Sequence, residues 1–283
     1  MNITNEKLFL NVKDYSVSKE AFELIHDEDL DMLYTSPKPN NSELSRYYES
    51  EDYISHTDGK RSIFEKAYHF VKGFALKNKL ELINKLQKQK GNLLDIGAGT
   101  GDFLTVVKAN NWNVEGFEPN EKARAIAHMK GLNLTQNTSE FANASFDIIT
   151  MWHVLEHVSD LDGQIKELKR LIKPSGTIIV AVPNFKSYDA NYYKEFWAAY
   201  DVPRHLWHFS KTSIEKLFQK ENLELSEVLP MKFDSFYVSL LSEKYKTGKM
   251  NFLKASYVGL KSNIKAKNNK EYSSQIYIIN NKI

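Results

Sequence analysis

The sequence predicts an α/β fold in which helices cover both faces of a mostly parallel, Rossmann-like sheet. The first observation is an apolar run at residues 93–96, which breaks into alternating glycines and continues into a helix-like pattern. The second is an apolar strand at 113–117, which ends in the acid Glu118, 21 positions after Gly97. A strand, a glycine turn, a helix and a second strand form half of a nucleotide-binding sheet.

The remaining elements follow from periodicity and from turn signals. Residues 60–90 carry apolar side chains at three- and four-residue spacing, which predicts helices that cap the sheet before its first strand. Thr212 and Glu215 have the spacing of a capping box and predict the start of another helix. Residues 223–229 and 273–279 predict strands, the last of which closes the sheet and gives it an antiparallel edge, and residues 235–266 predict a helical insertion between them.

The glycine spacing discriminates between nucleotide ligands. Gly97, Gly99 and Gly101 form G-x-G-x-G. The dinucleotide-binding fingerprint is G-x-G-x-x-G, and this chain has Asp102 and Phe103 where the third glycine of that fingerprint would lie. A pyrophosphate is therefore not the favoured ligand. Glycines allow the backbone to approach a ligand closely, and an acid at the end of the next strand has the spacing to reach a ribose diol. The pattern favours a cofactor that contains a nucleoside.

At this point the sequence resembles the class I S-adenosylmethionine-dependent methyltransferases. Residues 95–101, Asp-Ile-Gly-Ala-Gly-Thr-Gly, are similar to the first motif of that family, and Glu118 is similar to the acid that ends its second motif. Residues 145–158 resemble the fourth strand and the helix after it, and residues 171–184 resemble the turn into the fifth strand. The resemblance implies a seven-stranded sheet, S-adenosylmethionine as cofactor and S-adenosylhomocysteine as product.

The resemblance also implies which residues hold the cofactor. The glycines would lie against its methionine and ribose portions, Asp95 would order the loop or take the amino group, and Glu118 would accept both ribose hydroxyls. Thr138 would lie beside the adenine, and the alternative is that it belongs to a solvated loop. Tyr53, in an aromatic segment, would contact the cofactor site, and the alternative is that it packs in the core. The complete expected set is Asp95, Gly97, Ala98, Gly99, Gly101, Phe103, Glu118, Pro119, Thr138, Trp152 and Tyr53.

His153, Glu156 and His157 form H-x-x-E-H, which matches an inverted zinc-protease signature and would place both histidines on one helical face. The position directly after a strand of the methyltransferase frame argues against a protease. The ubiquinone-pathway O-methyltransferases, which this chain resembles, carry an E-x-x-E-H version that can hold a divalent metal. Three roles stay open for this motif: His153 acts as a general base or contacts the substrate, the motif binds a metal, or Glu156 and His157 pack structurally. A metal is not the favoured role.

Residues 197–210 combine aromatic side chains with Asp, Arg and two histidines, and they resemble a P-R-H-L-x-H-F-S motif of a subgroup of bacterial methyltransferases. Loops beyond the carboxyl ends of strands bind ligands in α/β enzymes. We therefore expect His205 or His208 as a catalytic base and Arg204 as an anchor for an anionic group. The alternative is an Asp201–Arg204 pair with histidines that cap the next helix. Two further residues expected at the acceptor are Tyr188 and Trp197.

Two domains are expected. Residues 1–58 form an N-terminal extension that resembles a small zinc-ribbon module of some bacterial relatives, but the chain has no cysteine, so the metal is expected to be absent. Residues 59–283 form the methyltransferase domain, with a helical cap at about 235–268. In the family, an insertion of this kind covers the substrate.

Composition and net charge limit the classes of function that the chain can have. The chain has 38 basic and 36 acidic residues, a net charge of +2, and no apolar run long enough to span a bilayer, so we expect a cytoplasmic protein with no membrane partner. The expected activity is methyl transfer to an oxygen or nitrogen of a small metabolite or glycan-derived acceptor. Eight lysines and no acid between residues 244 and 270 keep RNA methylation open as an alternative, although nucleic acid is not the favoured partner. A noncatalytic nucleoside-binding module is the other alternative. The sequence does not indicate an oligomer interface.

Overall fold

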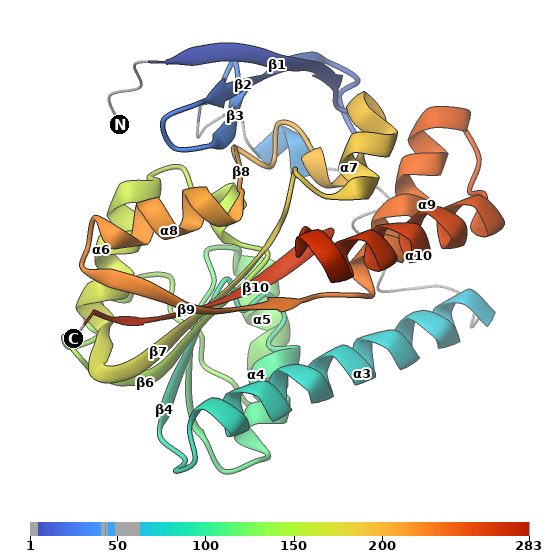
Figure 1. Ribbon diagram of the computed structural model, residues 1–283. Coiled ribbons are helices and arrows are strands. Elements are labelled where there is room, and N and C mark those ends of the chain that lie inside the picture. Colours follow the sequence, from blue (N-terminus) through green and yellow to red (C-terminus); the bar gives the residue numbers. More distant parts are fainter. Residues whose placement is uncertain (1–4, 41–42, 44, 49–62, 283) are drawn as a thin grey trace.

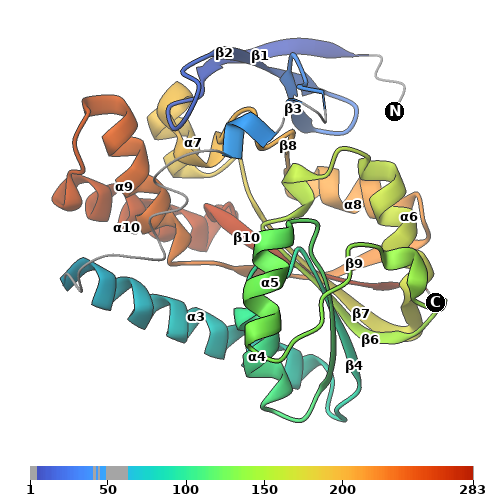
Figure 2. The same ribbon diagram turned by 180° about the vertical axis from the view of Figure 1, so that it is seen from behind.

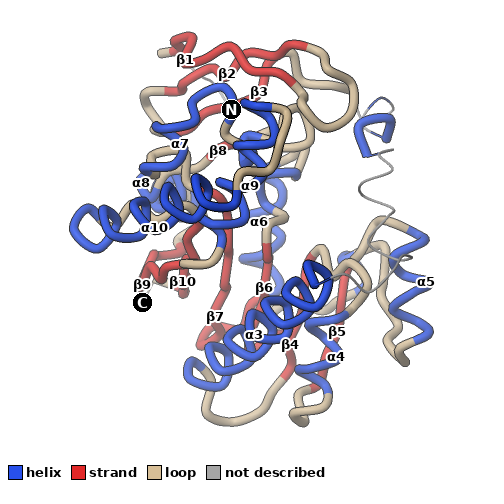
Figure 3. The backbone as a smooth tube through the Cα atoms, turned by 90° about the vertical axis from the view of Figure 1, so that its right-hand side faces the viewer, coloured by secondary structure: helices blue, strands red, loops and turns tan. Residues whose placement is uncertain are grey.

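The computed structural model describes residues 5–40, 43, 45–48 and 63–282, and these residues form two β-sheets with helices packed around them (Figure 1). The larger sheet has six strands in the order β5-β4-β6-β7-β10-β9, and a four-stranded sheet has the order β1-β2-β3-β8. Figure 3 shows the smaller sheet at one end of the molecule, beyond the segment that contains α7 (Tyr188–Tyr193). The predicted α/β class is confirmed.

The central sheet is mixed. Its strands β5, β4, β6 and β7 are parallel, whereas β10 pairs antiparallel with β7 on one side and with β9 on the other. The prediction of an antiparallel edge is therefore wrong, because the antiparallel closing strand lies inside the sheet and β9 is the edge. The strand bounds are β4 (Asn92–Ile96), β5 (Asn113–Phe117), β6 (Phe146–Trp152), β7 (Ile172–Pro183), β9 (Leu223–Pro230) and β10 (Ser274–Asn281).

The prediction of seven strands is not confirmed, because six strands are present in the described part of this sheet. At the β5 edge, the place of a further strand is taken by one isolated parallel bridge between Phe117 and Thr135. The Thr135 side chain donates 3.0 Å to the Asn137 carbonyl, and Asn137 then caps a 3-10 turn. The chain turns away after one pair of ladder hydrogen bonds, too early to form a strand.

Apolar side chains alternate along the strands and form a core on each face of the sheet. Leu94 belongs to the core under α6 and α8, whereas its neighbour Leu93 belongs to the core under α3, α4 and α5. The helix α8 is capped by Ser210, which exchanges hydrogen bonds with Ser213, so the cap lies two residues before the predicted cap Thr212. The covering helices are α3 (Ile63–Leu86), α4 (Asp102–Lys108), α5 (Glu121–Met129), α6 (Leu161–Leu171) and α8 (Lys211–Gln219).

The smaller sheet ties the N-terminal segment to the rest of the chain. Its strands are β1 (Glu6–Lys13), β2 (Ala21–Asp27) and β3 (Met32–Ser36), and the fourth, β8 (Trp207–His208), comes from the segment between β7 and α8. The apolar face of this sheet packs on Trp197 and Tyr200. The expected boundary near residue 58 thus separates two segments that share one sheet, and no observation supports a zinc ribbon.

The segment predicted as a helical cap forms two helices between β9 and β10, α9 (Asp234–Thr247) and α10 (Phe252–Asn269). Figures 1 and 2 show this pair on one side of the molecule, between the smaller sheet and the N-terminal end of α3. The remaining elements are the 3-10 turns η1 (Ser45–Tyr48), η2 (Thr138–Glu140), η3 (Leu155–His157), η4 (Lys194–Phe196) and η5 (Ala198–Tyr200).

Candidate cofactor and acceptor site

The glycine turn between β4 and α4 depends on glycine for its backbone conformation and, at two positions, for close packing. Gly97, Gly99 and Gly101 have φ values of 72°, 54° and 77°, a region that disfavours residues with a Cβ. A Cβ at Gly97 would lie 2.4 Å from the Val154 side chain, and one at Gly101 would lie 2.5 Å from Leu132. A Cβ at Gly99 would meet nothing within 4 Å. Gly99 therefore faces open space, where a ligand can approach the backbone.

Glu118 is fixed at the end of β5 by the turn itself. Its Oε2 accepts a hydrogen bond from the Gly99 backbone N–H at 2.8 Å, and its Oε1 accepts one from Asn120 at 2.8 Å. The residue is 8% exposed. Each carboxylate oxygen can accept more than one hydrogen bond, so this oriented carboxylate retains capacity for the two hydroxyls of a ribose.

Trp152, at the end of β6, supplies an independent sign of a bound group. Its ring packs edge-on against Phe103 of α4 at 5.6 Å, and its buried indole Nε1 has no hydrogen-bond partner among the described residues. A buried donor without a partner costs about 1–3 kcal/mol, so such donors are uncommon in folded proteins. The open side of Gly99, the oriented Glu118 and this donor together fit a nucleoside cofactor.

Lys79 of α3 is a candidate residue that the sequence reading missed. Its Nζ lies 4.3 Å from the centre of the Trp152 ring and 5.8 Å from that of Phe103. Burial lowers the pKa of Lys79, whereas the charges of Asp95 and Asp234 oppose that shift. In the sequence it is one of many lysines in an amphipathic segment, and no motif distinguishes it from the others.

Asp95 lies inside the sheet and joins β4 to β6. Its Oδ1 accepts a hydrogen bond from the Thr150 hydroxyl at 2.6 Å. Burial raises the pKa of Asp95 to about 7, although Thr150 and Lys79 favour the charged form. This geometry supports the ordering role among the alternatives predicted for Asp95.

The other predicted cofactor residues are placed as follows. The Ala98 backbone N–H donates to the Phe117 carbonyl at 3.0 Å, so Ala98 shapes the turn, and Pro119 is exposed directly after Glu118. Thr138 begins η2, and its carbonyl accepts a hydrogen bond from Arg170 at 3.1 Å. Tyr53 lies outside the described residues. Adenine contact by Thr138 stays a prediction.

His153 does not lie on a helix, which corrects the helical face inferred from H-x-x-E-H. Its φ is 57°, and only the short turn η3 follows it. Its Nδ1 lies 3.3 Å from Glu156 Oε1 and its Nε2 lies 3.2 Å from Asp234 Oδ2. Burial lowers the pKa of His153, but the two carboxylates outweigh burial and raise it to about 10. His153 is thus a cation that joins the end of β6 to the start of α9, which argues against a proton acceptor at neutral pH.

This ion pair predicts a pH-dependent stability. Because the pKa of His153 is raised from 6.5 to about 10, its contribution to the free energy of unfolding is complete below about pH 6.5 and is lost as the pH rises toward 10. We expect urea unfolding to show a decline over this range that His153→Gln removes. An equal decline in His153→Gln would assign the pH dependence to other groups.

His205 and His208 lie where β8 joins the smaller sheet. His205 Nδ1 lies 2.9 Å from the Ala199 carbonyl oxygen, and His208 Nε2 lies 3.1 Å from the Thr35 hydroxyl. Burial lowers the pKa of His205 to about 4, with the charge of His157 acting in the same direction, and burial also lowers the pKa of His208. Both histidines are neutral and buried at the contact between the two sheets. Their role as bases stays a prediction that this placement does not favour.

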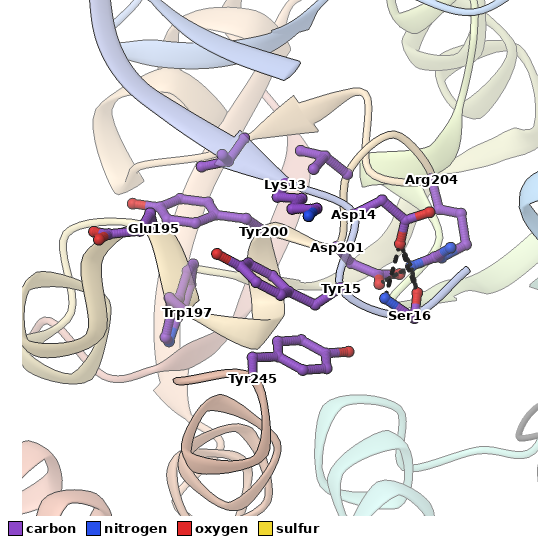
Figure 4. A pocket seen from close by; sticks show the side chains of 12 residues that line it. Lys13, Asp14, Tyr15, Ser16, Glu195, Trp197, Tyr200, Asp201, Arg204 and Tyr245 are labelled. Carbon is purple, nitrogen blue, oxygen red and sulfur yellow. Dashed lines mark hydrogen bonds and ion pairs between the residues drawn. The ribbon is translucent and has the colours of Figure 1, made fainter. Parts of the chain in front are cut away.

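Arg204 is saturated by protein partners (Figure 4). It forms ion pairs with Asp201 and with Asp14 of the N-terminal segment, and it donates to the Tyr47 carbonyl at 2.8 Å and to the Ser16 hydroxyl. Burial raises the pKa of Asp14, but backbone donors and Arg204 outweigh burial and hold the pKa at about 2. Arg204 therefore joins the N-terminal segment to the rest of the chain, which favours the predicted Asp201–Arg204 pair over an anion anchor.

The two predicted acceptor residues are also engaged within the protein. Trp197 is 2% exposed, and its Nε1 donates to Asp189 at 2.8 Å. Tyr188 of α7 stacks with Tyr192 at 6.1 Å and lies beneath lysines of α10. Contact of either residue with an acceptor stays a prediction.

The fold and the glycine turn define a class of protein, namely α/β proteins that bind a nucleoside cofactor at the carboxyl ends of parallel strands. A family model described as "Methyltransferase domain" matches residues 68–228. Because this match covers more than half of the 283 residues, the chain belongs to this family, that of the S-adenosylmethionine-dependent methyltransferases. The family predicted from the four motifs is thus confirmed.

Several curated proteins are similar to part of the chain. A ubiquinone biosynthesis O-methyltransferase of Rickettsia canadensis is 28% identical over 159 residues, which cover 51% of this chain and 67% of that protein. A demethylmenaquinone methyltransferase of Lactobacillus johnsonii is 32% identical over 114 residues, which cover 35% of this chain and 46% of that protein. The chain spans about half the length of the curated relatives it matches.

Two solved structures show the same fold. An S-adenosylmethionine-dependent methyltransferase of Thermotoga maritima, described as a possible histamine N-methyltransferase, has a TM-score of 0.53 and 22% identity and covers 77% of this chain and 94% of its own. The geranyl diphosphate C-methyltransferase of Streptomyces coelicolor has a TM-score of 0.53 and 14% identity and covers 81% of this chain and 88% of its own. That structure holds Mg²⁺, geranyl diphosphate and S-adenosylhomocysteine.

Paired glycine substitutions separate folding from binding at the turn. Gly97→Ala forces a methyl group into Val154, and we expect a loss of about 3 kcal/mol of stability from backbone strain and overpacking. Gly99→Ala meets open space, so its cost is the backbone strain of about 1 kcal/mol, whereas its methyl group occupies the ligand side of the turn.

Thermal unfolding and calorimetric titration with S-adenosylhomocysteine measure the two effects. The expected result for Gly99→Ala is a folded protein whose affinity falls about tenfold or more, since each 1.4 kcal/mol is tenfold. Wild-type affinity in Gly99→Ala would contradict the assignment of Gly99 to the ligand face.

Proposed function

We propose that this chain transfers a methyl group from S-adenosylmethionine to an oxygen or nitrogen of a small metabolite or glycan-derived acceptor. The observation that carries the proposal is the Glu118 carboxylate, which the Gly99 and Asn120 N–H groups orient at the open side of the glycine turn. The names of curated relatives, which include quinone-pathway methyltransferases, support an acceptor that is a small molecule.

Each residue of the site has a role that follows from its placement. Glu118 accepts the ribose hydroxyls, and the turn at Gly99 lets the backbone lie against the cofactor. Lys79 is a cation above the ring of Trp152 and is suited to the carboxylate of the methionine portion. The sulfonium of the cofactor supplies an activated methyl group, so alignment of the acceptor supplies most of the catalysis.

On the acceptor side, the structure favours positioning by the cap over proton transfer by His153. The His153 cation holds Asp234, the first residue of α9, against the end of β6. The start of α9 is thereby fixed beside Trp152 and Lys79. A proton from a hydroxyl acceptor would go to another group or to solvent, because His153 already carries its proton at neutral pH.

The test is transfer of a labelled methyl group from S-adenosylmethionine to a panel that contains phenols, amines, sugar nucleotides and total RNA. The proposal predicts product in a small-molecule fraction, lost in Glu118→Ala. Label in RNA alone would favour the RNA methyltransferase, for which the lysines of residues 244–270 are the supporting observation. Tight binding of the cofactor with no turnover on any acceptor would favour the noncatalytic module.

A further inference from the structure

The helix α10 presents an apolar stripe to solvent. Leu253 is 87% exposed, and Tyr257, Leu260 and Ile264 are each more than half exposed. Their spacing of four, three and four residues places them on one side of the helix. Single exposed apolar residues need no explanation, but an aligned set on one helix marks an interaction surface.

The opposite side of α10 is firmly packed, so the stripe is not a consequence of a loosely held helix. The buried side consists of Ala255, Val258, Gly259, Ser262 and Ala266. Gly259 lies so close to α9 that a Cβ there would be 2.9 Å from the Phe236 ring. Ser262 donates to the buried Asp189 carboxylate at 2.6 Å. The protein therefore holds α10 with its apolar stripe outward.

Lysines line one flank of the stripe and lie over tyrosine rings. Lys254, Lys261 and Lys265 follow one another at seven and four residues, and no acid occurs between residues 244 and 270. The Lys261 and Lys265 Nζ atoms lie 5.3 and 4.6 Å from the ring centre of Tyr188, and Lys254 lies 5.8 Å from that of Tyr257. Tyrosine and lysine beside an apolar stripe are the side chains that favour a membrane–water interface.

We infer that α10 lies on an anionic lipid surface, with its apolar stripe in the headgroup region and its lysines against lipid phosphates. Charge complementarity selects this occupant: a second copy of this face offers no carboxylate between residues 244 and 270 to pair with the lysines, whereas an anionic bilayer pairs with them. None of the helices in the described ranges has both the length and the apolar character needed to cross a bilayer. Surface attachment needs neither property, so the inference revises the expectation of no membrane partner.

The experiment is sedimentation of the full chain with vesicles of phosphatidylcholine alone or mixed with phosphatidylglycerol, without cofactor or acceptor. We expect binding to the mixed vesicles, weakened at high salt. Replacing Lys254, Lys261 and Lys265 by Gln should weaken it about 100-fold, given about 1 kcal/mol for each basic residue at the surface. Leu253→Gln with Leu260→Gln should weaken it about tenfold or more through lost apolar burial.

The matched controls change the same chemistry elsewhere. The exposed Lys77, Lys88 and Lys122 replaced by Gln, and Met129→Gln on α5, should retain wild-type binding. Equal loss in the control lysine variant would reduce the effect to net charge and overturn the inference. It would also be overturned by no binding to mixed vesicles, or by a dimer in analytical ultracentrifugation that Leu253→Gln with Leu260→Gln dissociates. Methyl transfer is not part of this measurement, so its outcome is independent of the proposed function.

Discussion

Replacing Glu118 with alanine is expected to weaken binding of S-adenosylhomocysteine by about 100-fold or more. Hydrogen bonds to a charged partner contribute about 1.5–3 kcal/mol each, and a ribose diol makes two of them. The variant also removes the acceptor that orients the Gly99 N–H. Calorimetric titration measures the dissociation constant, and circular dichroism checks that the variant is folded.

Two further variants make this result specific. Glu118→Gln keeps one acceptor oxygen and should lose less affinity than Glu118→Ala. Glu121→Ala removes the same charge from the exposed first turn of α5 and should bind as the wild type does. If Glu118→Ala bound with wild-type affinity while folded, the cofactor would have to lie elsewhere.

Replacing Arg204 with methionine is expected to cost about 3–5 kcal/mol of stability, because two carboxylates would be left without their cation in a buried site. Asp14 lies within the N-terminal segment and Asp201 precedes β8, so the loss should be felt first at the contact between the two sheets. Urea unfolding measures the free energy, and hydrogen exchange of β1–β3 shows where the protection is lost.

The control for Arg204 is an exposed ion pair of the same kind. Arg46→Met breaks the pair with Glu20, in which both side chains are largely solvated, and should cost less than about 1 kcal/mol. Asp201→Asn added to Arg204→Met should restore part of the stability by removing one of the two charges. If Arg204→Met lost no more stability than Arg46→Met, the ion pairs of Arg204 with Asp14 and Asp201 would contribute little to the fold.

The cofactor turn was predictable because its determinants are local. Gly97, Gly99 and Glu118 lie within one strand–turn–helix–strand unit, and backbone geometry alone converts their spacing into proximity. The number of strands was less predictable. Whether the chain near Thr135 forms a strand or one bridge depends on a side-chain hydrogen bond that competes with the ladder.

The positions of the residues expected at the acceptor were poorly predictable because their contacts are distant in sequence. Arg204 and Asp14 lie 190 positions apart, and His208 and Thr35 lie 173 positions apart, so no spacing rule connects them. The prediction that His153 lies on a helix was wrong for another reason. Its motif has helical spacing, but its left-handed backbone and its two carboxylate partners appear only in three dimensions.

Titration of the wild-type chain with S-adenosylhomocysteine tests the central claim most directly. The site built from Gly99, Glu118 and Trp152 predicts saturable binding to one site, accompanied by a change in tryptophan fluorescence that Trp152→Phe removes. A folded protein that releases no heat and shows no fluorescence change at millimolar ligand would contradict the cofactor site and the activity that rests on it.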